Sequence, residues 1–297
     1  MTRVLYLAGW GRSGTTIIDN VLGSHPGVFT TGELWFLWER GLLGGRSCGC
    51  GEPVRCCPLW REVLRRAYGP NVPDPRQVKR WQRESARARH TMRVLRHGHP
   101  LVSVFSKLYA AVAEVTGATT IVDSSKLPSG AAVLARQQAG VTPYLLHVVR
   151  DPRAVAHSWQ RPKRQLDRSA PAMMVRHGPY DSAVKWVSWN GLIERAARAF
   201  PGRYLRLRYE DFAADPRAAI AGVLAFAQTA PGTSPFRGER TVELSANHTV
   251  SGNPGRFRTG TVEVRADEAW RGELPASSRL ATTALTLPLM RRYGYRV

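Results

Sequence analysis

The chain has 297 residues, of which 43% are hydrophobic, so it can bury a sizeable core and fits one large α/β domain, with or without inserts. Its formal net charge of +21 comes mostly from arginine and suits a polyanionic ligand, nucleic acid or simply a solvated surface rich in arginine. The basic residues are spread along the chain, without a basic tail or a zinc-finger or RNA-binding signature, which argues against a nucleic-acid partner.

The amino-terminal segment and the hydropathy pattern indicate no stable membrane insertion. A single arginine in MTRVLYLAG leads directly into a short strand-like run that ends in glycine, and no apolar stretch approaches the length of a membrane span. We therefore expect a soluble, cytoplasmic protein without stable membrane insertion. The sequence leaves the oligomeric state open.

The first 34 residues predict a phosphate-binding strand, loop and helix. Residues 4–8 form an apolar run typical of a buried strand, residues 9–14 form a turn bounded by glycines, and a helix begins at Thr15. In such a unit the free backbone N–H groups converge at the positive end of the helix dipole. Residues 9–16 match the nucleotide P-loop pattern G-x-x-x-x-G-K-[ST], except that Thr15 replaces the lysine, so Arg12 has to bring the positive charge.

A carboxylate and a histidine follow the first predicted helix. The apolar run LWFLW is expected to pack as a helix, which puts Glu33 in its first turn, on the same side of the sheet as the phosphate loop. A carboxylate there either only completes the helix dipole or acts as a general base near the phosphate end of the site. His25 is the competing base, although its place before a proline in a turn favours a structural role.

All four cysteines, Cys48, Cys50, Cys56 and Cys57, fall within the segment SCGCGEPVRCCPLW. A four-thiolate zinc site usually uses two C-x-x-C pairs, which a C-x-C followed by an adjacent pair fits poorly. Disulfides that staple a surface loop and reduced thiols are each at least as well supported as a metal. We therefore assign no metal and no catalytic role to this segment.

The next segment is helical and very basic, with arginines on several faces of residues 63–99. We expect a helical insert over about residues 60–115, within a single domain of residues 1–297. This insert forms either a cap over the site or a solvated outer pair of helices.

Two further predicted strands end in polar residues. One covers residues 119–122 and leads into DSSK, and the other is the nearly continuous apolar run TPYLLHVVR, typical of a parallel strand covered on both faces. Polar residues at the carboxyl ends of parallel strands lie where open α/β sheets bind ligands. We therefore favour a role at the transferred group for Lys126 over a plain surface lysine. Arg150 and Ser158, at a strand end and two turns into the next helix, can face one phosphate.

These elements predict an α/β fold with a central parallel sheet flanked by helices and a P-loop-like strand, loop and helix. Residues 159–189 mix arginines, two methionines and several aromatic residues, which suits a mobile acceptor-binding segment or an ordinary surface insert with a helix from Ser182 onward. Residues 266–293 are expected to be helical. The expected packing residues of this tail are Trp270, Leu280, Leu285, Leu287 and Leu289.

The segments GRSGTT and VVRDPRAVAHSW together resemble the two donor-binding motifs of the sulfotransferases that use 3'-phosphoadenosine 5'-phosphosulfate (PAPS). In that family the first motif holds the 5'-phosphosulfate, and an arginine and a serine eight residues later hold the 3'-phosphate. A P-loop without its lysine is a feature of this family. The resemblance assigns the phosphosulfate to Arg12, Ser13, Gly14, Thr15 and Thr16, and the 3'-phosphate to Arg150 and Ser158.

Other segments extend this resemblance over about residues 4–258. SHPGVFTTGE is similar to the protein-tyrosine sulfotransferase branch, where the glutamate of a Gly-Glu pair is the base, which implies Glu33. In the small-molecule cytosolic branch the base is a histidine in a K-T-H-like segment. DSSKLP aligns with that segment in more than one register, one of which places Lys126 there, so no histidine base is evident. Similarities of LRYEDF and NHTVSGNPGRFRTG to nucleotide-binding segments imply donor contacts from Tyr209, Gly252, Arg256 and Arg258.

The resemblance implies a bacterial sulfotransferase nearer to the carbohydrate and protein-tyrosine branch. It would move the sulfonate of PAPS to a hydroxyl of a small-molecule or carbohydrate-like acceptor, such as a natural product, giving a sulfate ester and 3'-phosphoadenosine 5'-phosphate (PAP). Glu33 would take the acceptor proton while Lys126 and Arg12 stabilise growing negative charge, with no metal required. Two other classes stay open: a P-loop kinase, which needs the missing lysine and a magnesium-binding aspartate, and a non-catalytic nucleic-acid-binding protein.

Overall fold

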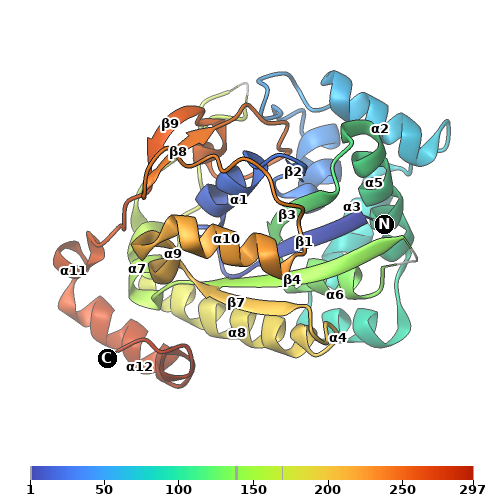
Figure 1. The fold of residues 1–297 in the computed structure, drawn as a ribbon. Coiled ribbons are helices and arrows are strands. Elements are labelled where there is room, and N and C mark those ends of the chain that lie inside the picture. The colour runs from blue at the N-terminus through green and yellow to red at the C-terminus, as the bar shows by residue number, and fades with distance from the viewer. Residues whose placement is uncertain (1, 138–139, 169, 297) are drawn as a thin grey trace.

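The computed structural model describes residues 2–137, 140–168 and 170–296, and its centre is a five-stranded parallel sheet with helices on both faces (Figure 1). The strand order is β2-β3-β1-β4-β7, and each neighbouring pair runs parallel. This arrangement confirms the predicted α/β class. The strands of the sheet are β1 (Thr2–Ala8), β2 (Val28–Thr30), β3 (Thr120–Lys126), β4 (Val141–Val149) and β7 (Tyr204–Arg208).

The central strand β1 is apolar on both faces because its alternate residues serve two core layers. Val4 and Tyr6 belong to one layer, and Leu5 and Leu7 belong to the other. This two-sided burial is the reason why β1 and β4 appear in the sequence as continuous apolar runs. It also leaves the loops at the carboxyl ends of these strands free to form a site.

The two layers contain different helices. The layer of Val4 and Tyr6 contains α2 (Pro58–Tyr68), α3 (Pro75–Ser85), α4 (Ala88–His97), α5 (Pro100–Thr116), α6 (Pro128–Ala135) and the end of α8 (Pro179–Ala197). The layer of Leu5 and Leu7 contains α1 (Thr15–Gly23), α9 (Tyr209–Ala214), α10 (Pro216–Phe226) and the antiparallel pair β8 (Thr241–Leu244) and β9 (Gly260–Glu263). Residues 138–139, between α6 and β4, lie outside the described residues.

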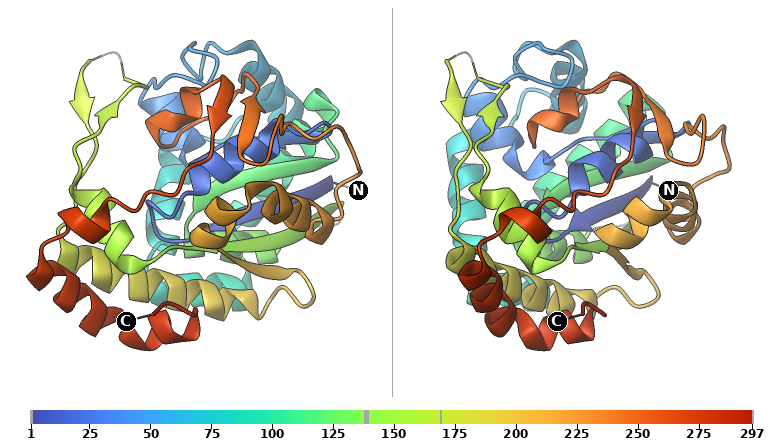
Figure 2. Two further views of the ribbon diagram at one scale, coloured as in Figure 1. Left: turned by 60° about the vertical axis from the view of Figure 1, so that its left-hand side comes forward. Right: turned by 90° about the vertical axis from the view of Figure 1, so that its left-hand side faces the viewer.

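The remaining helices gather beside α8 at one end of the sheet. α7 (Pro152–Gln160) and α12 (Ala276–Arg292) pack on α8 and on each other, and the short α11 (Trp270–Glu273) packs on α7. Figure 2 shows two short antiparallel strands, β5 (Arg164–Gln165) and β6 (Ala172–Met173), standing out from the body of the protein. They belong to the segment 159–189, in which residue 169 lies outside the described residues.

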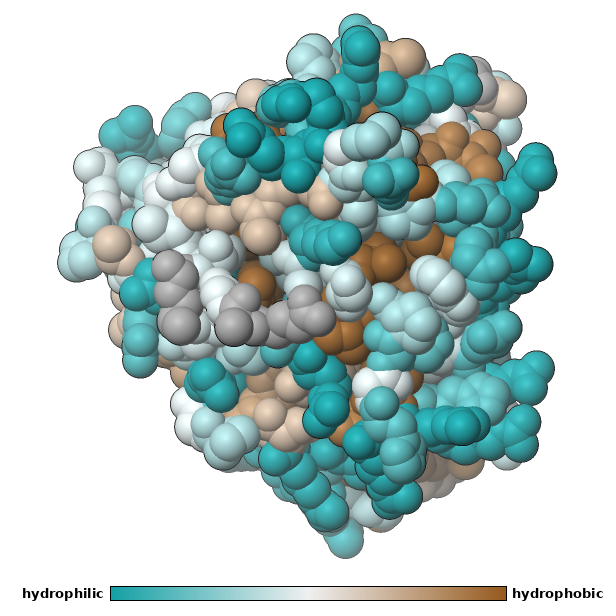
Figure 3. All heavy atoms as spheres, turned by 90° about the vertical axis from the view of Figure 1, so that its right-hand side faces the viewer, coloured by the Kyte–Doolittle hydropathy of each residue, from teal (hydrophilic) through white to brown (hydrophobic). Residues whose placement is uncertain are grey.

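The basic helices of the segment 60–115 form an outer layer. Their arginines at positions 76, 80, 83, 87, 89, 93 and 96 are exposed, which agrees with a solvated arginine-rich surface. Figure 3 shows the side of the molecule that is on the right in Figure 1, where hydrophilic side chains cover the rim and apolar ones are confined to patches nearer the middle. Among the helices within the described ranges, none has both the length and the apolar composition needed to cross a bilayer.

Two predicted helices differ in detail from expectation. The run LWFLW begins a 3-10 turn, η1 (Leu34–Phe36), which continues as a π-helix, η2 (Leu37–Leu43). In the carboxyl-terminal tail Trp270 is buried as predicted, whereas Leu280 is 72% exposed and the prediction that it packs was wrong. The buried side of α12 consists of Thr282, Thr283, Thr286 and Met290.

Candidate active site

A cavity of about 1050 Å³ lies where β1, β3 and β4 end. The residues that follow these strands line it, as expected for the carboxyl edge of an open parallel sheet. Its charged lining residues are mostly basic: Arg12, Arg40, Lys126, Arg150, Lys163, Arg164, Arg258 and Arg265, against the acidic Glu33, Glu263 and Asp267. The cavity therefore suits an anionic ligand.

The loop between β1 and α1 joins a strand to a helix as predicted, and α1 begins at Thr15. Gly14 caps this helix with a φ of 85°, and a Cβ atom added to it would lie 2.2 Å from the ring of Tyr209. Only glycine fits there, because the position needs both left-handed backbone and empty space. Thr15 and Thr16 line the cavity at the positive end of α1. Ser13 instead turns its hydroxyl back, donating to the carbonyl of Trp10 at 2.7 Å.

Arg12 presents an incompletely paired cation to the cavity. Its guanidinium lies 4.7 Å from the centre of the Trp159 ring, and its Nη2 lies 3.6 Å from the sulfur of Met174. Its Nε and Nη1 are buried, and no hydrogen-bond acceptor within the described part of the chain reaches them. Burial lowers the pKa of Arg12, but a guanidinium stays charged at neutral pH. Buried donors without acceptors are costly, so this side chain is suited to bind an anion.

Glu33 and Lys126 form a close ion pair in the same cavity, with Lys126 Nζ 2.5 Å from Glu33 Oε1. Arg40 contacts the other carboxylate oxygen of Glu33 at 3.1 Å. Burial raises the pKa of Glu33, but the charges of Lys126 and Arg40 outweigh burial and hold that pKa below the ordinary value of a glutamate. Glu33 is therefore ionised at neutral pH, as a group that accepts a proton must be.

Arg150 and Ser158 lie close to the phosphate loop. Arg150 follows β4, donates through Nη1 to the carbonyl of Arg12 at 3.2 Å, and pairs through Nη2 with Asp267 at 3.3 Å. Its guanidinium lies 4.6 Å from the centre of the Tyr209 ring. Ser158, on α7, lines the same cavity. The fold thus brings both sequence motifs to one site, as the spacing of the strands predicts.

Of the three residues of NHTVSGNPGRFRTG that were expected to contact the donor, two line the cavity and one does not. Gly252 and Arg258 line it, as does Tyr209, which is the first residue of α9 and not part of a strand. Arg256 is only 2% exposed, and its guanidinium donates to the carbonyls of Thr249 and Ser47, both at 2.6 Å. It is absent from the described lining of the cavity, so we correct its assignment from donor contact to internal support of this segment.

Sequence reasoning missed two basic residues of the site. Arg40 lies seven residues after Glu33, and Lys163 is one of several basic residues in RPKRQ, so nothing local marks either of them. Burial, and then the nearby charge of Arg12, lower the pKa of Lys163. The competing base His25 has its Nδ1 2.9 Å from the carbonyl of Pro26 and does not belong to the described lining. It is a turn residue.

The two predicted inserts relate differently to the cavity. In the described structure, none of the lining residues of the cavity comes from the segment 60–115. The segment 159–189 does contribute to the site. Its lining residues are Trp159, Lys163, Arg164, Leu166, Met174 and Trp189.

Comparison with known proteins identifies the family. Residues 5–230, well over half of the chain, match the family model described as "Sulfotransferase family". The chain belongs to the sulfotransferase family. It is therefore a sulfotransferase, an enzyme of sulfonate transfer, and this membership displaces the kinase alternative. A search of curated proteins finds no match.

Solved sulfotransferase structures share the fold. The sulfotransferase domain from the curacin biosynthetic pathway is 16% identical, with a TM-score of 0.54 over 100% of this chain and 99% of that one. The sulfotransferase domain of the Synechococcus PCC 7002 olefin synthase is 18% identical, with a TM-score of 0.50 over 100% and 96% of the two chains. At these identities the similarity concerns the fold, a central parallel sheet flanked by helices.

Proposed function

We propose that this sulfotransferase uses PAPS as its donor and transfers the sulfonate to a hydroxyl of a small-molecule or carbohydrate-like acceptor. The products would be a sulfate ester and PAP. The observation that carries the proposal is that two anion-binding loops, one with Arg12 and one with Arg150, line the same cavity as an ionised glutamate, Glu33. A donor with phosphate groups at both ends of its nucleoside needs two such loops.

The donor-binding residues follow from this arrangement. The N–H groups at the start of α1, with Thr15, Thr16 and Arg12, would hold the 5'-phosphosulfate. Arg150 and Ser158 would hold the 3'-phosphate. The unsatisfied donors of Arg12 support this fit, because an equatorial anionic oxygen would supply the acceptors that they lack.

The reacting groups of the chain would be Glu33, Lys126 and Arg12. PAPS supplies an activated sulfonate on a phosphate leaving group. Glu33 would accept the proton of the acceptor hydroxyl, while Lys126 donates hydrogen bonds to the oxygen that bridges phosphorus and sulfur. Arg12 would stabilise charge on the sulfonate oxygens. These cations supply the positive charge that the transfer needs, so we propose no metal ion at the sulfonate.

The acceptor side would be formed by the segment 159–189. Trp159, Leu166 and Met174 give the cavity an apolar wall beside basic residues. Leu166 and Met173 are also more than half exposed, which suits a surface that an acceptor covers. The neighbours named for curacin biosynthesis and for an olefin synthase favour a natural-product acceptor. The Gly-Glu pair at Glu33 favours the carbohydrate and protein-tyrosine branch.

A transfer experiment tests this function. The full chain is incubated with PAPS and a panel of phenols, sugars and hydroxylated natural products, and products are analysed by mass spectrometry. We expect PAP and a product heavier than its acceptor by one SO₃ group. Transfer of phosphate from ATP under the same conditions, without any sulfated product from PAPS, would contradict the proposal.

A further inference from the structure

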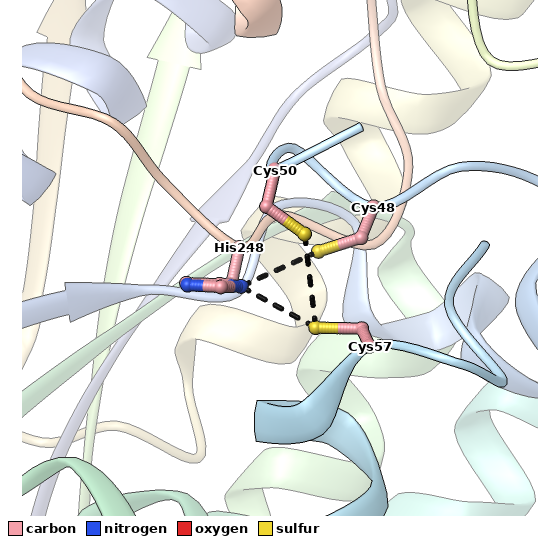
Figure 4. A group of neighbouring side chains, drawn as sticks. All are labelled: Cys48, Cys50, Cys57 and His248. Carbon is pink, nitrogen blue, oxygen red and sulfur yellow. Dashed lines mark hydrogen bonds between the residues drawn. The ribbon is translucent and has the colours of Figure 1, made fainter. Parts of the chain in front are cut away.

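Three cysteines and a histidine converge at a place separate from the cavity. The sulfur atoms of Cys48, Cys50 and Cys57 and a ring nitrogen of His248 all lie within 4.8 Å of one another. Figure 4 shows the three thiols and the imidazole pointing toward a common centre, with the cysteines on one loop and His248 on another segment of the chain. None of these four residues lines the cavity described above.

The distances fit a tetrahedral metal site. Zinc binds sulfur at about 2.3 Å and histidine nitrogen at about 2.0–2.1 Å, so tetrahedral angles separate two sulfur ligands by about 3.8 Å and a sulfur from a nitrogen by about 3.5 Å. The structure has 3.8 Å between the sulfurs of Cys50 and Cys57. Nδ1 of His248 lies 3.4 Å from the sulfur of Cys57 and 3.7 Å from that of Cys48.

We propose that Cys48, Cys50, Cys57 and His248 bind one zinc ion with a structural role. Four protein ligands of the Cys3His type fill a tetrahedral shell and leave no position for a substrate, as in structural zinc sites. Thiolate and imidazole ligands select zinc over magnesium or calcium. All four cysteines are free thiols in the structure.

The backbone holds the ligands in place before any metal binds. The N–H of Cys48 donates to the carbonyl of Glu52 at 2.7 Å and the N–H of Gly51 to the carbonyl of Cys48 at 2.9 Å, which closes the turn that carries the first two thiols. The indole N–H of Trp60 donates to the carbonyl of His248 at 2.8 Å. Such support from the surrounding shell fixes ligand orientation in metal sites.

The cysteine loop is also fitted closely to the histidine segment. Gly49 donates its N–H to the carbonyl of Thr249 at 2.9 Å, and a Cβ atom on Gly49 would lie 1.9 Å from the side-chain oxygen of Asn247. The two segments are about 190 residues apart in sequence, since Cys57 and His248 differ by 191 positions. A metal ion bound by both segments would add a direct link between these two distant parts of the sequence.

The site lies next to the donor-binding segment. Ser251, three residues after His248, accepts a hydrogen bond from Arg40 at 3.0 Å, and its carbonyl accepts one from the N–H of Glu33 at 3.2 Å. The following residue, Gly252, lines the cavity. The zinc ion would therefore act as a positioning element, holding this segment against the residues around Glu33 without contacting any substrate.

The test is the metal content of the full chain, purified under reducing conditions without chelator and without a histidine tag. Cys56 provides a matched control, because it adjoins Cys57 but is exposed and not part of the cluster. We expect one zinc per chain in the wild type and in Cys56→Ser, and at least a tenfold loss of zinc in Cys57→Ser and in His248→Ala. Equal zinc content in Cys56→Ser and Cys57→Ser would overturn the proposal.

A second measurement on the wild type does not depend on how the variants fold. Replacing zinc by Co²⁺ should give the intense visible absorption of tetrahedral cobalt together with a thiolate-to-cobalt charge-transfer band, and a strong chelator should lower the melting temperature. A reduced wild-type chain that holds no zinc and gives no such bands with Co²⁺ would overturn the proposal. So would a metal-free protein in which Cys50 and Cys57 are joined as a disulfide.

Discussion

The replacement Glu33→Gln tests the reacting centre with the smallest change of shape. The amide keeps one oxygen that can accept a hydrogen bond from Lys126 or Arg40, and removes the charge and the proton-accepting ability. General bases typically contribute about 10²–10⁴-fold in rate, or about 2.7–5.4 kcal/mol of barrier. We therefore expect kcat to fall by about that factor. The affinity for PAP should not weaken, because the variant frees two cations near the donor.

The chain offers a matched control in Glu39→Gln. Glu39 also pairs with two cations, Lys79 at 2.8 Å and Arg83 at 3.4 Å, but it lies outside the described lining of the cavity. Initial rates of PAP release with an acceptor from the panel, alongside calorimetric titration with PAP, separate catalysis from donor binding. We expect the control to keep wild-type kcat. Wild-type kcat in Glu33→Gln would remove Glu33 from the base role.

Three further predictions concern the donor site and its supports. Arg150→Ala should weaken PAP binding by about 10–100-fold, the usual effect of losing a charged hydrogen bond. It should have little effect on the binding of AMP, which lacks the 3'-phosphate. Equal losses of affinity for PAP and AMP in calorimetry would refute the assignment of Arg150 to the 3'-phosphate. Gly14→Ala should lower both the melting temperature and PAP affinity, because a Cβ atom there meets Tyr209 at 2.2 Å with φ at 85°; an unchanged melting temperature would contradict this. Burial raises the pKa of Asp19 to about 7. Between about pH 4 and pH 7 the folded state therefore holds a proton that the unfolded state has released. The contribution of this carboxyl to stability falls as the pH rises through that range. Asp19→Asn should therefore raise the free energy of unfolding in urea by up to about 4 kcal/mol at pH 8, and by less at pH 5, whereas an equal gain at both pH values would exclude the titration.

The elements that position the site were predictable because their signals are local. The apolar runs of β1 and β4 end in glycines or at Arg150, and the phosphate loop is contiguous in sequence. The carboxyl ends of parallel strands meet at one edge of the sheet, which is why Lys126 and Arg150 could be placed together before the fold was known. The position of Glu33 follows from the same local pattern.

Long-range partners were not predictable in this way. The cysteine spacing argued against a metal because the sequence pattern contains only the cysteines. His248, the fourth residue of the cluster, approaches them only through the tertiary fold. The same limit applies to Arg256, whose basic character suggested a phosphate contact. Its guanidinium instead binds the carbonyls of Thr249 and Ser47 inside the protein.

Periodicity identified helices but not their packing or hydrogen-bond type. The apolar pattern after Glu33 fits a helix, yet it does not distinguish α from π hydrogen bonding in η2, because the two repeats hardly separate over the seven residues of this element. In α12 Leu289 packs against the core as expected, but Leu280 is exposed. Thr286 is buried instead, with its hydroxyl donating to the carbonyl of Thr282 at 2.7 Å. A threonine whose hydroxyl is satisfied within its own helix can be buried without an unpaired polar group.

Calorimetric titration of the full chain with PAP and with ATP, at matched ionic strength, tests whether the cavity binds a PAPS-type donor. PAP carries phosphate at both the 3' and 5' positions, whereas ATP carries none at the 3' position that Arg150 and Ser158 would hold. We expect tight binding of PAP and at least tenfold weaker binding of ATP. Equal affinities, or tighter binding of ATP, would contradict the assignment of the two loops to a PAPS donor.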